Sequence, residues 1–140
     1  MKHNVHVWQM VEIELESSVH LDSPYTQIDV WVDLIGPGFA RRVYGFWDGD
    51  NRFLVRVVGT APGEWRWSSG SSIAGIGLDG HTGSFEAIAW TEEELSENPC
   101  RRGFLRSTPN GHGLQFPDGV PHYYLADTWW ATPTFRYPWV

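Results

Sequence analysis

The sequence is poor in cysteine, in lysine and in long apolar runs, and each shortage excludes a class of protein. The single cysteine, Cys100, excludes an intramolecular disulfide. Lys2 is the only lysine, and the net charge is −7. That balance argues against nucleic acid or an anionic membrane as a partner, because both select basic patches. No apolar run approaches the roughly 18 residues of a membrane span.

Signals for export and for cofactors are missing as well. The N-terminal run MKHNVHVWQMVEIELE alternates apolar and polar residues and contains no unbroken apolar segment of a signal peptide. It therefore predicts a strand and an intracellular location. His3, His6 and His112 have no neighbouring ligands in the sequence, so we expect neither a metal nor a cofactor.

Aromatic residues are abundant, with nine tryptophans among 140 residues, and hydrophobic residues make up 41% of the chain. This is the composition of a globular domain that can bury a core without disulfides or metals. Most of the aromatic rings should lie in that core. Some are expected at the surface, where a flat ring suits a sugar or a protein partner.

Residues up to 90 alternate in period two and are interrupted by turn residues, with no sustained helical period. The clearest runs are VEIELE, IDVWVDLIG, RRVYGFW, RFLVRVV, EWRWSS and SFEAIAW. We predict an all-β fold over residues 1–90, namely an antiparallel immunoglobulin-like β-sandwich.

The composition changes at residues 91–103, TEEELSENPCRRG, which we interpret as a linker. Thr91 and Glu94 have the spacing of a capping box, so this linker could contain one helical turn. Residues 104–140 form a C-terminal extension. QFPDGVPHYYL predicts a hairpin with a Pro-Asp-Gly turn. The strand that should follow, HYYLAD, is apolar on both faces and predicts burial against a partner or self-association.

The stretch GFWDGDNRFLVRV, residues 45–57, has three interpretations. A calcium loop would need an acidic residue where its twelve residues close, and the stretch DGDNRFLVRVVG that begins at Asp48 has none there. A glycosidase pair would need a neighbour that keeps one carboxyl protonated, and the sequence offers none. The hairpin interpretation is favoured, because Gly49 supplies the positive φ of a tight turn.

The segment APGEWRW predicts a turn at Pro62-Gly63 followed by a strand. Trp65 and Trp67 share one face of that strand, and at least one of them should belong to the core. Glu64 is expected to pair with Arg56 across strands. On another strand, Trp31 lies on the polar face and is a candidate for sugar binding or interdomain packing.

Several spaced motifs together resemble a known family. Their residues are Gly45, Phe46, Asp48, Gly49, Arg56, Pro62, Gly63, Glu64, Trp65, Gly83, Ser84 and Phe85 in the sandwich, and Asp118, Gly119, Pro121, Tyr123, Tyr124, Leu125, Asp127, Thr128 and Trp130 in the tail. The first set resembles the N-terminal β-sandwich that precedes certain bacterial glycoside hydrolase barrels. The second resembles the lead-in hairpin and first strand of apiosidase-like (β/α)8 barrels, with Ala126 in place of a usual glycine.

This resemblance implies the front end of a glycoside hydrolase with most of the barrel absent. Three hypotheses follow: a non-catalytic accessory domain that braces the barrel, an enzyme with an unrecognised carboxylate pair, and a carbohydrate-binding module. The module would need a coplanar exposed pair among Trp8, Trp31, Trp65, Trp67 and Trp90. The candidate carbohydrate-binding residues are Trp31, Trp65, Trp67, Asp127, Trp129 and Trp130; no catalytic residue is assigned. The expected partners are the missing barrel, a second copy, or carbohydrate.

Overall fold

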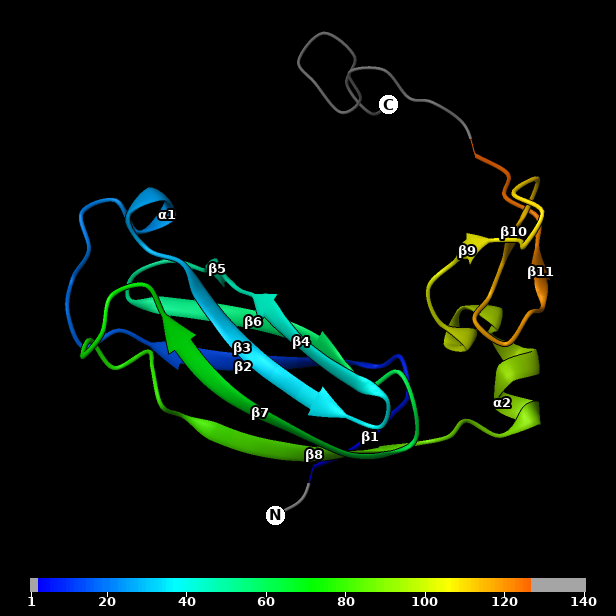
Figure 1. Ribbon diagram of the computed structural model, residues 1–140, viewed down its shortest axis with the longest axis horizontal. Coiled ribbons are helices and arrows are strands. Elements are labelled where there is room, and N and C mark those ends of the chain that lie inside the picture. Colours follow the sequence, from blue (N-terminus) through cyan, green and yellow to red (C-terminus); the bar gives the residue numbers. More distant parts are fainter. Residues whose placement is uncertain (1–2, 127–140) are drawn as a thin grey trace, which may run out of the picture. The chain divides into compact units, whose positions relative to one another are not determined.

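The computed structural model describes residues 3–126, which divide into two compact units with the boundary between Gly103 and Phe104. The first unit contains two β-sheets (Figure 1). Its strands are β1 (His3–His6), β2 (Met10–Glu16), β3 (Val30–Gly36), β4 (Phe39–Tyr44), β5 (Phe46–Trp47), β6 (Arg52–Val58), β7 (Gly63–Ser71) and β8 (Thr82–Ile88). The predicted all-β sandwich is confirmed.

The larger sheet has the strand order β1-β8-β7-β3-β4, and the smaller sheet has the order β2-β6-β5. Every pairing in the two sheets is antiparallel except that of β1 with β8. The first strand, β1, thus lies beside β8, the last strand of the sandwich, in the larger sheet. The chain then continues as β2 in the smaller sheet. This order of strands is immunoglobulin-like.

The core lies between the sheets and is built from the inward residues of the alternating strands. Its members include Val30, Val32 and Leu34 of β3, Ile13 and Leu15 of β2, Phe53, Val55 and Val57 of β6, and Trp65 and Phe85 of β7 and β8. Trp65 is fully buried, stacks parallel to Phe85 with ring centres 6.2 Å apart, and donates its indole N–H to the Ala61 carbonyl. The prediction that one tryptophan of the pair lies in the core is confirmed.

The predicted single strand RRVYGFW is wrong, because the chain changes sheets at Gly45. β4 ends at Tyr44 in the larger sheet, and β5 begins at Phe46 in the smaller one. The Gly45 amide donates to the Val30 carbonyl at 2.8 Å. A Cβ at Gly45 would lie 2.6 Å from the Leu54 carbonyl oxygen, so only glycine lets the chain pass here without a shift.

Three short helices lie outside the sheets. The first of them, α1 (Pro24–Gln27), begins with a buried proline. Within residues 91–103 lie α2 (Glu92–Glu97) and the 3₁₀ helix η1 (Pro99–Arg102). The capping box of α2 is confirmed, because the Glu94 amide donates to the Thr91 hydroxyl and the Thr91 amide donates to the Glu94 carboxylate. Within the described part of the chain, no helix is long and apolar enough to span a membrane.

Aromatic contacts hold residues 91–103 to the sandwich. The Trp90 indole donates to the Val7 carbonyl at 2.8 Å and stacks on His6, with ring centres 3.7 Å apart. The Arg101 guanidinium lies 4.7 Å from the centre of the same indole. These contacts make the two short helices an extension of the sandwich edge.

Over its described residues, 104–126, the second unit is a three-stranded meander of β9 (Arg106–Ser107), β10 (Leu114–Gln115) and β11 (Pro121–His122). The predicted hairpin with a Pro-Asp-Gly turn is confirmed, since β10 pairs with β11 and the Gly119 amide donates to the Phe116 carbonyl. The predicted strand HYYLAD is wrong over its described residues, because β11 ends at His122. Tyr123 and Leu125 are 85% and 84% exposed, and residues 123–126 pair with no strand of the described chain.

Candidate functional site

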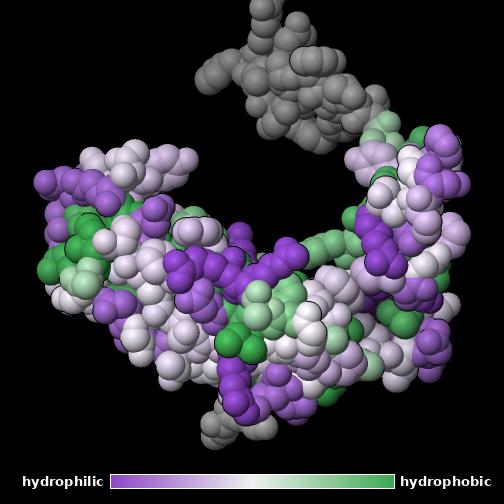
Figure 2. All heavy atoms as spheres, viewed as in Figure 1, coloured by the Kyte–Doolittle hydropathy of each residue, from purple (hydrophilic) through white to green (hydrophobic). Residues whose placement is uncertain are grey.

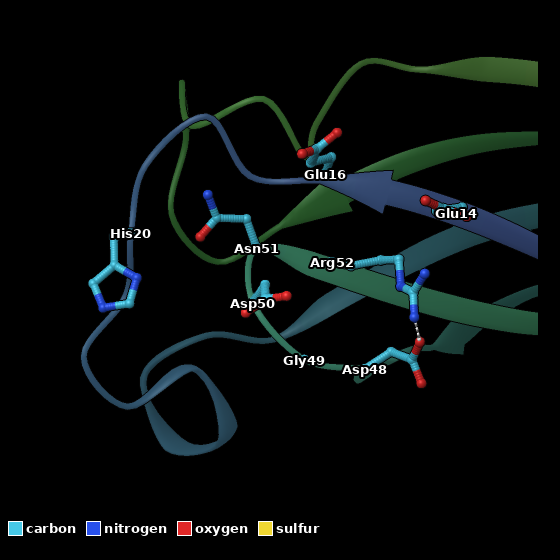
Figure 3. Close-up of a pocket in the computed structure, with 8 residues that line it drawn as sticks. All are labelled: Glu14, Glu16, His20, Asp48, Gly49, Asp50, Asn51 and Arg52. Carbon is cyan, nitrogen blue, oxygen red and sulfur yellow. Dashed lines mark hydrogen bonds and ion pairs between the residues drawn. The ribbon is translucent and has the colours of Figure 1, made fainter.

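A polar hollow of about 570 Å³ lies at the end of the smaller sheet, where the β5–β6 turn approaches β2 (Figure 3). It is lined by Glu14, Glu16, His20, Asp48, Gly49, Asp50, Asn51 and Arg52. These residues come from β2, from the loop after it, from the turn and from the start of β6. The hollow therefore contains the two aspartates of the GFWDGDN stretch together with two glutamates.

The turn itself is a tight hairpin, as predicted. The Asp48 amide donates to the Arg52 carbonyl, and the Arg52 amide donates to the Gly49 carbonyl, each at 2.9 Å. Gly49 and Asp50 have φ angles of 103° and 47°, in the left-handed region that tight hairpin turns require. The Asp48 carboxylate forms an ion pair with Arg52. The Trp47 indole donates to the Asp50 carbonyl at 2.9 Å and fixes the turn from the side.

The hollow contains four acidic side chains, Glu14, Glu16, Asp48 and Asp50, and their surroundings limit the chemistry that they suit. A carboxyl that acts as a general acid is favoured by apolar surroundings, and none of the described residues that line this hollow is apolar. One of its aspartates, Asp48, is already held by a guanidinium. Among residues 3–126, no group of three or more histidines, cysteines, aspartates or glutamates is arranged to hold a metal ion.

Trp65 and Trp67 differ in what they can bind. Trp65 has no exposed surface, so its assignment as a carbohydrate-binding residue is wrong. Trp67 is half-buried and faces inward at the edge of the core, against Gly83. A Cβ at Gly83 would lie 2.5 Å from the Trp67 ring, which shows how closely the indole covers that backbone.

Trp31 lies on the outward face of the larger sheet and is partly covered. A Cβ at Gly70 would lie 2.6 Å from its indole nitrogen, so the ring rests on the backbone of β7. The Arg42 guanidinium lies over the ring at 4.2 Å, and Tyr44 meets it edge-on, with ring centres 6.2 Å apart. Figure 2 shows one face of the molecule, on which hydrophilic and hydrophobic residues of the described part of the chain are intermixed.

The Asp33–Arg42 pair fixes the cover of Trp31. Both Asp33 oxygens accept from Arg42, at 2.9 and 3.0 Å. These hydrogen bonds lower the pKa of Asp33, and they raise the pKa of Arg42. The pair is exposed, so it orients the guanidinium and contributes little to stability.

The other two tryptophans of the proposed coplanar set are also covered. Trp8, with a φ of 64°, packs against Gly103, where a Cβ would lie 2.4 Å from its ring. Trp90 is stacked on His6 and faces Arg101. Neither ring presents a clear platform for a sugar. Asp127, Trp129 and Trp130 lie outside the described residues.

The predicted pair of Arg56 with Glu64 is wrong. Arg56 donates to Glu12 at 2.8 Å across the β2–β6 pair, while Glu64 accepts from Arg66 on its own strand. The reason is topological, because β6 and β7 follow one another in the chain but belong to different sheets.

Sequence reasoning missed a second hollow of about 340 Å³, beside α1 and β5. Its lining is Pro24, Tyr25, Ile28, Asp29, Val30, Tyr44, Gly45, Phe46, Trp47 and Phe53. The one signal in the sequence is the aromatic run YGFW around Gly45. Tyr25 lines the hollow only because α1 lies beside β5, and the run YGFW does not reveal the position of α1.

Comparison with known proteins finds one matching family model and one similar solved structure. A family model described as a domain of unknown function, DUF5060, matches residues 4–72, just under half of the chain. A search of curated proteins finds no match. Among solved structures, one titled as a putative glycoside hydrolase from Bacteroides vulgatus is similar, with 24% identity and a TM-score of 0.70 over 87% of this chain. At that identity the likeness establishes the fold alone, and the chain spans only 22% of the Bacteroides chain.

Proposed function

We propose that this chain is the non-catalytic front part of a glycoside hydrolase, in which the β-sandwich braces a (β/α)8 barrel and lines one wall of its substrate cleft. The observation that carries the proposal is the unequal coverage of the Bacteroides protein. The likeness extends over 87% of this chain and only 22% of a chain titled as a glycoside hydrolase. A domain that fills so small a share of an enzyme suits an accessory role.

The motifs of the sequence support the same parentage. The sandwich motif Pro-Gly-Glu-Trp, residues 62–65, places Trp65 at the centre of the core. In the motif Gly-Ser-Phe, residues 83–85, the backbone of Gly83 packs against the Trp67 ring, and the Phe85 ring stacks on Trp65. These residues are therefore framework of a sandwich that resembles the domain in front of apiosidase-like barrels.

The make-up of the acid-rich hollow at the β5–β6 turn supports a non-catalytic role. Hydrolysis requires an acid kept protonated and a second carboxylate across the sugar. The acid-rich hollow at the β5–β6 turn has only polar lining, and its Asp48 is occupied by Arg52. In the proposed enzyme, the catalytic pair comes from the barrel, as does the partner surface for residues 104–126.

An activity assay on the 140-residue chain tests the proposal. The chain is incubated with a panel of aryl glycosides, and release of the aryl alcohol is compared with a blank. We expect no release above the blank. Hydrolysis that is abolished in Asp48→Asn, and retained in Asp79→Asn as a control far from the β5–β6 turn in sequence, would contradict the non-catalytic role.

A further inference from the structure

The hollow between α1 and β5 has the form of a small binding cleft. α1 lies against β5 (Figure 1), and the hollow of about 340 Å³ opens between them. That volume falls in the range of small-molecule sites, roughly 300–1,000 Å³. The cleft is separate from the acid-rich hollow, with which it shares no lining residue.

The cleft has an apolar floor and aromatic walls. Pro24, Ile28, Val30 and Phe53 are buried and close its base. Tyr25 and Trp47, which are 84% and 40% exposed, stand at the surface on opposite elements, α1 and β5. Tyr44 and Phe46 also line the cleft, but the Tyr44 ring meets Trp31 and the Phe46 ring lies under the Arg56 guanidinium, 4.8 Å from its centre, so neither is counted as a free face. Aromatic rings placed on the rim of a hollow leave faces for a ligand, whereas rings in the core do not.

The β5 wall of the cleft is held in place before any ligand arrives. The Trp47 indole N–H is engaged by the Asp50 carbonyl at 2.9 Å, which fixes the orientation of the ring. The chain enters β5 through Gly45, whose amide donates to Val30 at 2.8 Å and whose Cα is packed against the Leu54 carbonyl. A pre-formed site loses less conformational entropy on binding.

The charges of the lining select against anions. Among the described residues, Asp29 is the one charged residue that lines the cleft, and no lysine, arginine or histidine of that part of the chain does so. Two hydrogen bonds with Ser72 hold the Asp29 backbone. The Ser72 amide donates to the Asp29 carbonyl, and the Asp29 amide donates to the Ser72 hydroxyl. The Asp29 carboxylate forms no hydrogen bond or ion pair with another described residue. It is therefore available as an acceptor.

We propose that this cleft binds a neutral saccharide. The apolar C–H face of a pyranose ring packs on an aromatic ring such as Trp47 or Tyr25, and sugar hydroxyls donate to the free carboxylate of Asp29. A uronic acid or a sulfated sugar would meet that carboxylate without a compensating cation. The inference goes beyond the accessory role, because sugar binding here requires no catalytic domain.

The test is an NMR titration of the ¹⁵N-labelled chain, with the Trp47 indole N–H as reporter. The probes are cellohexaose, xylohexaose, mannohexaose and maltohexaose, each to millimolar concentration. We expect at least one to shift the reporter saturably. Tyr25→Ala and Asp29→Asn should each weaken that binding at least about 10-fold. Tyr25 is largely exposed and Asp29→Asn is isosteric, so both variants should fold.

The control is Tyr123→Ala, which removes an equally exposed tyrosine outside the cleft and should leave the affinity unchanged. Three results would overturn the proposal. They are no shift with any of the four probes, binding that survives both cleft variants, and a stronger response to choline or to oligogalacturonate. A choline response would mark a cation site of aromatic rings and carboxylate.

Discussion

The guanidinium of Arg42 covers the indole of Trp31, at 4.2 Å from the ring centre, and shields the aromatic surface that the sequence had offered for sugar binding. Asp33 holds the guanidinium there through two hydrogen bonds. Exposure of Trp31 is thus controlled by its neighbours on β3 and β4.

Arg42→Ala should uncover Trp31. We expect greater quenching of tryptophan fluorescence by acrylamide in the variant, because one face of the indole loses its cover. Arg42→Lys should have an intermediate effect, since an ammonium cannot form the paired contact with Asp33. The same Arg42→Ala change in a Trp31→Phe background is the control. An equal increase in both backgrounds would mean that other tryptophans respond.

The packing of Trp65 on Gly36 makes a second prediction. A Cβ at Gly36 would lie 2.4 Å from the Trp65 ring, which is fully buried and has no room to move. Gly36→Ala should lower the free energy of unfolding by about 1–3 kcal/mol through overpacking. Trp65→Ala should lower it by about 3–5 kcal/mol through the cavity it leaves.

Urea denaturation followed by circular dichroism measures both changes. Gly113→Ala is the matched control, because a Cβ there would come no closer than 3.4 Å to a neighbour. An unchanged midpoint of urea denaturation for Trp65→Ala would contradict the placement of this ring at the centre of the core.

Much of the sandwich is predictable because alternation reveals which face of a strand is buried. The inward residues of β3 are the ones that the period-two pattern of IDVWVDLIG selects. Alternation does not reveal which strand lies beside which. The pattern therefore missed the change of sheet at Gly45, and it paired Arg56 with Glu64 when the partner is Glu12.

The candidate sites were less predictable, because they depend on contacts between segments distant in sequence. The pattern placed Trp31 correctly on an outward face but could not show the cover provided by Arg42. It also placed Trp47 in a hairpin without showing that α1 brings Tyr25 to the same hollow. The capping box of Thr91 and Glu94, by contrast, is local, and the three-residue spacing of these two residues in the sequence predicted it.

The capping box predicts a pH dependence for α2. The backbone amide and the hydroxyl of Thr91 donate to the Glu94 carboxylate and lower the pKa of Glu94 below its ordinary value of 4.5. A lowered folded-state pKa means that the contribution to helix stability is present above 4.5 and is lost as the pH falls through the folded-state pKa.

Amide protection factors of Leu95 and Asn98, whose N–H groups bond within α2, should therefore fall on acidification below 4.5. Glu94→Gln should weaken this pH dependence, because its amide side chain does not titrate. Glu93→Gln, one residue earlier and outside the capping box, should retain it. If the protection factors fall in the same way with pH in the unmodified chain and in both variants, Glu94 is not the cause of the pH dependence.

The exposed aromatic end of the second unit predicts self-association. Tyr123, Tyr124 and Leu125 are 85%, 65% and 84% exposed, and three consecutive apolar side chains in water favour burial against a partner. Sedimentation velocity of the 140-residue chain should show a weight-average coefficient that rises with protein concentration. Replacing all three residues with serine should abolish the rise, whereas Tyr25→Ser, which removes a comparably exposed tyrosine from the first unit, should not. A chain that sediments as a monomer at every concentration would show that this segment needs no second copy, and would leave the barrel of a longer polypeptide as its proposed partner.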